Sequence, residues 1–173
     1  METITIRIYQ DDVYEEVAKA TDYTGSKLID SDDTARDRIL AGDEDLASLG
    51  RFWEESVLAT NENLKEMLVA GSTKQLLPEL EGTSQAPSRL PAVAISSKTG
   101  YEAVIEVSKA FDKMLTASVQ STLRSFFIAS IIGQWFKFAN KGEASDYFAQ
   151  AAEMMTAAER LLYSRRKPTR PSE

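Results

Sequence analysis

The residues that most often carry catalysis are missing from this sequence or are spaced unsuitably. The 173-residue chain contains no Cys and no His, which removes thiol nucleophiles, Cys/His zinc sites and His-based triads. The adjacent carboxylates Glu15/Glu16 and Glu54/Glu55 diverge on a helix, and Glu62/Glu66 share a face without a further ligand set. No phosphate-binding loop, dinucleotide fingerprint or nucleophile elbow is present. We therefore expect no enzyme, no cofactor and no metal ion.

Four aspartates lie close together in the sequence, as the carboxylate ligands of calcium sites do: Asp30, Asp32, Asp33 and Asp37. An EF-hand loop needs Gly at its sixth position and a bidentate Glu at its twelfth. Counting from Asp30, those positions hold Ala35 and Ala41. We therefore interpret the cluster as helix capping and a solvated face.

Charge is distributed unevenly along the chain. Residues 1–70 hold 17 Asp/Glu against 7 Lys/Arg, a net charge of −10, whereas residues 71–173 hold 10 against 13, a net charge of +3. An acidic front and a basic tail could attract copies of the chain to one another head to tail. Two independently solvated surfaces are the alternative. The overall net charge of −7 argues against bulk attraction to nucleic acid.

The first candidate partner-binding residues lie in the basic tail, residues 164–173: Arg165, Arg166, Lys167 and Arg170. Pro168 and Pro171 prevent a regular helix there. The tail is either a solvated terminus or a docking arm. Its charge suits an acidic neighbouring surface or phosphates.

The other candidate partner-binding residues end the most apolar run of the chain, residues 125–138: Trp135, Phe136 and Phe138. Polar residues interrupt the run at Ser125, Ser130, Gln134 and Lys137, whereas a membrane span needs about 18 or more unbroken apolar residues. We therefore expect the central core helix of a bundle. If any part of it is exposed in the monomer, the three aromatic residues should face a neighbouring subunit.

The periodicity of apolar residues predicts a mainly α protein, a helical bundle with a small antiparallel sheet beside it. We expect a short helix at about 11–21 and long helices at about 43–69, 112–140 and 143–163. We expect strands at about 2–9, 92–96 and 101–108, with a hairpin turn at Lys98-Thr99-Gly100. The polar segment from Tyr23 to Asp33 is interpreted as a loop.

A chain of this length is expected to form one domain, residues 1–163. Pro78, Pro87 and Pro91 lie within the long connector from Gly71 to Gly100, which is typical of a functional or irregular segment. We therefore expect an extended arm or hairpin at about 71–108. The basic C-terminal arm, residues 164–173, follows the domain.

Three segments resemble uncharacterised proteins encoded in phages and prophages of gut Bacteroidales bacteria: Ser125-Phe-Phe-Ile-Ala-Ser-Ile-Ile-Gly-Gln-Trp-Phe-Lys-Phe-Ala-Asn-Lys-Gly-Glu, Tyr147-Phe-Ala-Gln-Ala-Ala-Glu-Met-Met and Leu162-Tyr-Ser-Arg-Arg-Lys-Pro-Thr-Arg. Arg51-Phe-Trp-Glu-Glu also contributes. The resemblance covers most of the chain and is clearest from about residue 120 onward. The expected architecture is similar to that of the small helical head–tail connector (adaptor) proteins of tailed phages, which are ringed beneath the portal.

The resemblance implies a structural virion protein, a connector of the neck that forms a ring of about twelve copies between portal and tail. Its partners would be other copies, the portal protein and the next neck or tail protein, with DNA non-specifically nearby in the lumen and no membrane. It would reside in the host cytoplasm during assembly and then in the virion. The alternatives are another neck, tail-completion or terminator protein, or a non-virion cytoplasmic interaction or regulatory module.

Overall fold

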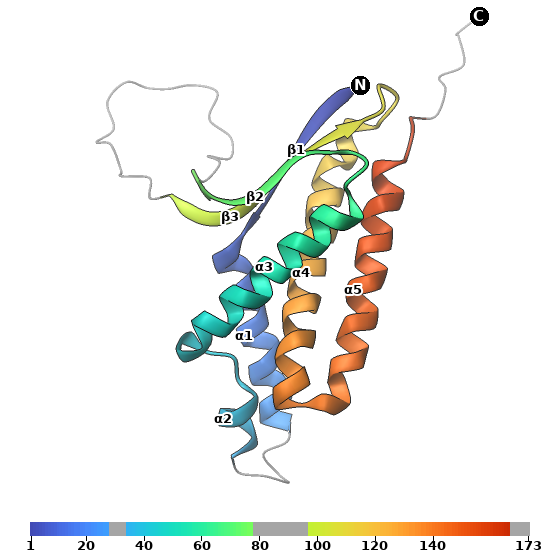
Figure 1. Ribbon diagram of the computed structural model, residues 1–173. Helices are drawn as coiled ribbons and strands as arrows, with labels where there is room; N and C mark the ends of the chain where they lie inside the picture. Colours follow the sequence, from blue (N-terminus) through green and yellow to red (C-terminus); the bar gives the residue numbers. More distant parts are fainter. Residues whose placement is uncertain (28–33, 78–96, 167–173) are drawn as a thin grey trace, which may run out of the picture.

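The computed structural model describes residues 1–27, 34–77 and 97–166. A helical bundle lies beside a small antiparallel sheet, which confirms the predicted fold class (Figure 1). The elements follow in chain order: β1 (Glu2–Tyr9), α1 (Gln10–Lys27), α2 (Ala35–Ile39), α3 (Leu46–Asn63), β2 (Leu68–Leu76), β3 (Lys98–Val107), α4 (Thr116–Ala139) and α5 (Lys141–Leu162). Short 3-10 turns precede α3 at Asp43–Asp45 and α4 at Lys113–Leu115.

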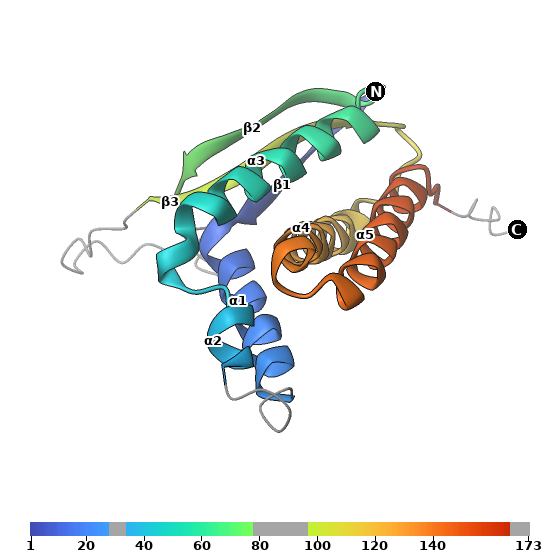
Figure 2. The ribbon, with the colours of Figure 1, turned by 60° about the horizontal axis from the view of Figure 1, so that its bottom comes forward.

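The three strands form an antiparallel sheet in the order β1-β3-β2. Ile4, Ile6 and Ile8 of β1 are buried, and they lie opposite Ile105, Ala103 and Tyr101 of β3, which are buried too. Polar residues alternate with them, as expected of a strand with one covered face. Figure 2 shows the helices gathered on one side of this sheet.

Helix α4 lies at the centre of the packing, in contact with α5, α1, α3 and β1. Its Phe127 is fully buried, with its ring centroid 4.8 Å from that of Trp53 in α3 and 5.4 Å from that of Tyr101 in β3. The predicted core helix is therefore the element that joins the sheet to the bundle. By length and mean hydropathy (1.2), residues Lys113–Ala139 also meet the criterion for a membrane span. A buried core helix meets the same criterion.

The predicted helix over 43–69 is wrong at its C-terminal end. Helix α3 ends at Asn63, and Leu68 already begins β2. The chain turns in between, where the Met67 N–H donates to Leu64 O (3.0 Å) and Met67 O accepts from the Glu106 N–H of β3 (2.7 Å). Pairing with β3 therefore outweighs the helical spacing of the apolar residues.

The predicted hairpin turn at Lys98-Thr99-Gly100 is also wrong, because these residues are the first of β3. They pair with Leu76, Gln75 and Lys74 of β2. The predicted strand at 92–96 lies outside the described residues. β2 and β3 form an antiparallel pair whose connection, residues 78–96, is likewise outside them.

The loop predicted from Tyr23 to Asp33 begins too early, since α1 continues to Lys27. The extra turn packs against α2, and a Cβ on Gly25 would lie 2.8 Å from the Cα of Arg36. Thr21 assists this approach, because its Oγ1 accepts a hydrogen bond from the Ala41 N–H (3.1 Å). Tertiary contact therefore extends the helix through a polar sequence.

Close packing in the central strand generates a prediction about Gly100. A Cβ there would lie 2.7 Å from the Ile8 carbonyl oxygen and 2.9 Å from Leu76 Cδ1. Gly100→Ala should therefore lower the free energy of unfolding by about 1–3 kcal/mol, because backbone must move to relieve the clash. Urea unfolding measures the effect.

Gly42→Ala is the matched control, since a Cβ at Gly42 would meet nothing within 4 Å. It should leave stability unchanged or raise it slightly. Equal tolerance of both substitutions would contradict the described register of β1, β3 and β2.

Candidate interaction surfaces

Lysines form ion pairs with Glu15, Glu16 and Glu62. Lys19 Nζ lies 3.0 Å from Glu15 Oε1 and 3.4 Å from Glu16 Oε1, and Lys65 Nζ lies 2.8 Å from Glu62 Oε1. These are exposed ion pairs within single helical turns. Among the described residues, no group of three or more His, Cys, Asp or Glu could hold a metal ion.

Only one member of the predicted acidic cluster can be placed. Asp37 belongs to the first turn of α2, where a negative charge is favourable to the helix dipole. Asp30, Asp32 and Asp33 lie outside the described residues.

The three aromatic residues at the end of α4 point to different surroundings. Phe136 is fully buried, with its ring centroid 5.4 Å from that of Tyr147 in α5. Trp135 is partly buried, and its indole N–H donates to Ile39 O (2.6 Å), which holds α2 against α4. Phe138 is 74% exposed. Of the three, Phe138 is therefore the one that presents most of its ring to a partner.

Phe138 belongs to a short stack of side chains at the surface. Its ring is stacked on Phe52 of α3, with centroids 6.5 Å apart. The guanidinium carbon of Arg51 lies 5.6 Å from the Phe52 centroid. Aromatic residues and arginine are both enriched at protein interfaces.

The base of the basic tail is held against residues 110–112, which precede α4. Arg165 forms an isolated antiparallel bridge with the buried Phe111, and the Arg166 N–H donates to Ala110 O (2.8 Å). The Arg166 Nε lies 3.8 Å from Asp112 Oδ1. Both arginine side chains are exposed, so the chain leaves the bundle from a fixed point with its first cations outward. Lys167 and Arg170 lie outside the described residues.

A cleft adjoins this exit point. It consists of two neighbouring hollows of about 250 and 240 Å³ between the turn after α3, the end of β3 and the end of α5. Both hollows are lined by Glu66, Met67 and Tyr163, while Met1 and Arg165 line the first. The N-terminus of the chain and the base of the tail therefore meet at one end of the molecule.

An apolar groove of about 300 Å³ runs between α4 and α5. It is lined by Ser125, Ile128, Ala129, Ile132, Tyr147, Gln150 and Met154. Its concave apolar surface lies on the outer side of the helical hairpin, where another protein could cover it.

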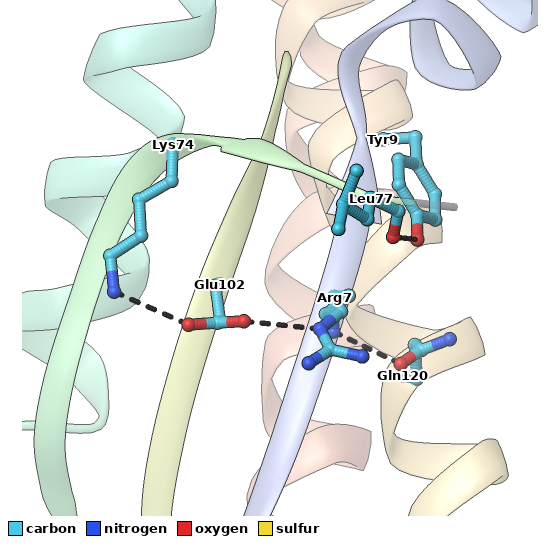
Figure 3. A network of polar contacts seen from close by, with 6 residues as sticks. All are labelled: Arg7, Tyr9, Lys74, Leu77, Glu102 and Gln120. Atoms are coloured by element: carbon cyan, nitrogen blue, oxygen red, sulfur yellow. Dashed lines mark hydrogen bonds and ion pairs between the residues drawn. The ribbon is translucent and has the colours of Figure 1, made fainter. Parts of the chain in front are cut away.

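The open face of the sheet carries a line of charged side chains across all three strands (Figure 3). Glu102 of β3 accepts from Arg7 Nε of β1 (3.0 Å) and from Lys74 Nζ of β2 (3.2 Å). The Arg7 backbone N–H donates to Gln120 Oε1 of α4 (3.0 Å). The Gln120 side chain therefore covers the outer edge of β1 at this position. The contacts with Arg7 and Lys74 lower the pKa of Glu102, with the hydrogen bond from Arg7 as the largest cause.

Comparisons with known protein families, with curated proteins and with solved structures found no match.

Sequence reasoning missed the line of ion pairs and both hollows. The alternation in residues 2–9 places Arg7 on the polar face, but its partners depend on the β1-β3-β2 order. The start of β2 was predicted as part of a helix and the rest of it as part of the long connector. The cleft and the groove join residues from distant parts of the chain. No local pattern signals them.

The charged line makes a prediction about pH. The folded-state pKa of Glu102 is below its unfolded value, so the stabilisation is present above about pH 4.5 and is lost as pH falls through the folded value. Glu102→Gln should therefore cost less than about 1 kcal/mol at pH 7, given the partial exposure of the ion pairs. The cost should vanish near pH 2, as measured by urea unfolding at both values.

Glu106→Gln on the same strand and face provides the control, and its cost should be the smaller at pH 7. An equal cost of Glu102→Gln at both pH values would show that the carboxylate charge contributes nothing.

Proposed function

We propose that this chain is a structural subunit of the neck of a tailed phage, a head–tail connector that forms a ring between portal and tail. The observation that carries the proposal is the fixed exit of the basic tail. The bridge between Phe111 and Arg165 holds the exit in place, with Arg165 and Arg166 exposed. A charged segment that leaves a rigid body at a defined point loses less orientational freedom on docking than one on a mobile base.

The remaining surfaces favour an interaction role over catalysis. Phe138 stands exposed with its ring stacked on Phe52, and the groove between α4 and α5 is apolar and open. In the described part of the chain, Glu15 and Glu16 form ion pairs with Lys19, and Glu62 forms one with Lys65. These features suit a protein that works by contact with other proteins.

The resemblance of residues 125–143, 147–155 and 162–170 to Bacteroidales phage proteins supports the phage-specific part of the proposal. The partners are then further copies of the chain, the portal protein and the next neck or tail protein. The location is the virion neck, after assembly in the host cytoplasm.

The direct test is mass spectrometry of density-purified particles from a phage or induced prophage that encodes this chain. We expect its peptides in intact particles, at about a dozen copies relative to a twelve-subunit portal. The copy number distinguishes a connector ring from a protein that adheres to particles in trace amounts.

A truncation after Arg166 sharpens the test, because it keeps the Phe111–Arg165 bridge while removing Lys167 and Arg170. We expect this truncated chain to fold, with unchanged far-ultraviolet circular dichroism, and to yield fewer tailed particles. Absence of the full-length chain from purified particles would overturn the connector proposal.

A further inference from the structure

A groove of about 440 Å³ lies between α1 and the segment that leads into α3. It is lined by Asp11, Tyr14, Glu15, Ala18, Ala41, Gly42, Asp43, Leu46 and Leu49. The residues from α1 follow the spacing i, i+3, i+4 and i+7 and therefore share one helix face. No Lys or Arg is among the lining residues, and the groove lies in the acidic front of the chain.

The groove combines an apolar floor with an acidic rim. Leu49 is buried, and Leu46 is 51% exposed. Asp11, Glu15 and Asp43 supply the acidic rim, of which Glu15 is already in an exposed ion pair with Lys19 (3.0 Å). Asp43 is the first residue of the 3-10 turn, whose cap position is Gly42, and it is Asp45 Oδ2 that accepts the Gly42 N–H (3.0 Å). Asp43 is thus available for a cation from outside.

Tyr14 gives the groove a rigid wall. Its ring meets Trp53 edge-on with centroids 6.3 Å apart, and its hydroxyl accepts from Gln10 Nε2 (2.9 Å). Burial raises the pKa of Tyr14 to about 12, so the phenol stays protonated at neutral pH. The wall is therefore in place before any partner arrives.

The shape and charge suit a short basic segment. Arginine and lysine stems cover apolar surface while their cationic ends stay at the polar rim. Residues 165–170 of this chain supply that composition, with Arg165, Arg166, Lys167 and Arg170. The charge of this segment is therefore complementary to the acidic rim of the groove.

The groove is beyond reach of the tail of the same molecule. Arg165 and Met1 line one cleft, and the eight residues of β1 carry the chain about 26 Å from it before α1 begins. Helix α1 then continues away from that end (Figure 1). Arg166 is held at Ala110, and four further residues reach at most about 14 Å. Arg170 cannot reach Asp43 within one molecule.

We propose that the groove between α1 and the start of α3 binds residues 165–170 of a second copy of the chain. Arg and Lys stems cover Leu46 and Leu49, and their cations pair with Asp43 and Asp11. The contact is heterologous, because groove and tail are different surfaces, and repetition of it closes a ring when the rotation allows. It deepens the assembly role proposed above by naming a contact between subunits.

Because the natural chain has no Cys, engineered cysteines test the contact cleanly. Full-length Asp43→Cys chain is mixed with full-length Arg170→Cys chain and oxidised mildly at low salt. We expect at least about fivefold more disulfide-linked heterodimer than with Glu55→Cys in place of Asp43→Cys, because docking raises the local thiol concentration. Glu55 is exposed on α3 and outside the groove. High salt should abolish the excess.

A chain that carries both Asp43→Cys and Arg170→Cys tests whether the contact is between molecules. We expect linked dimers and higher oligomers, and a closed monomer as the main product would overturn the proposal. Equal cross-linking of the Asp43→Cys and Glu55→Cys chains would overturn it too. So would a yield that does not depend on salt, because the rim charges would then play no part.

Failure of this contact and failure of the connector role can be told apart. A chain found in particles that shows no preferential Asp43–Arg170 cross-link remains a neck protein, with its groove bound by another protein or left open. A chain that cross-links through Asp43 yet is absent from particles assembles with itself outside the virion.

Discussion

Burial of helix α4 is the constraint on which the other elements depend. Eleven of its residues are buried, and they lie around most of its circumference. Each large apolar side chain among them contributes about 1.5–3 kcal/mol when it leaves water. No single neighbour could cover such a helix. The sheet and α3 cover one side through Tyr101 and Trp53, which pack against Phe127 of α4, while α1 and α5 cover others.

The remaining architecture follows from that requirement. Helix α5 approaches closely because small residues repeat along its buried face at Ala144, Ala151 and Ala158. On α4, Gly133 leaves room for Phe148, whose ring a Cβ would meet at 3.1 Å. The sheet is held to α4 at the edge of β1, where Gln120 accepts the Arg7 N–H.

Local patterns were sufficient where one element buries one face. The isoleucines of residues 2–9 alternate, so β1 was predictable, and the short connection at Asn140 indicated the α4–α5 hairpin. Strand β2 was not predictable, because Leu64, Met67 and Leu68 continue the helical spacing of α3. Its pairing with β3 determines that these residues form a strand, and β3 lies about thirty residues further along the chain.

The candidate surfaces show the same division. The basic character of Arg165 and Arg166 was evident from the sequence. The structure adds the backbone contacts that hold them, at Phe111 and Ala110. Trp135, Phe136 and Phe138 looked equivalent in sequence, yet helical geometry turns them about 100° apart per residue. One is buried, one holds α2 and one is exposed. The acidic groove could not be foreseen, since it needs α1 beside the residues that precede α3.

The central claim is that a single copy of this chain buries α4 without help from a partner. Its interaction surfaces would then not be needed for folding. Native-state hydrogen exchange of the dilute monomer tests it most directly. The amides of residues 123–136 should exchange most slowly of all, with a free energy equal to that of global unfolding and independent of protein concentration. Fast exchange in the monomer, or protection that appears only as copies associate, would contradict the account, because α4 would then depend on a partner for its cover.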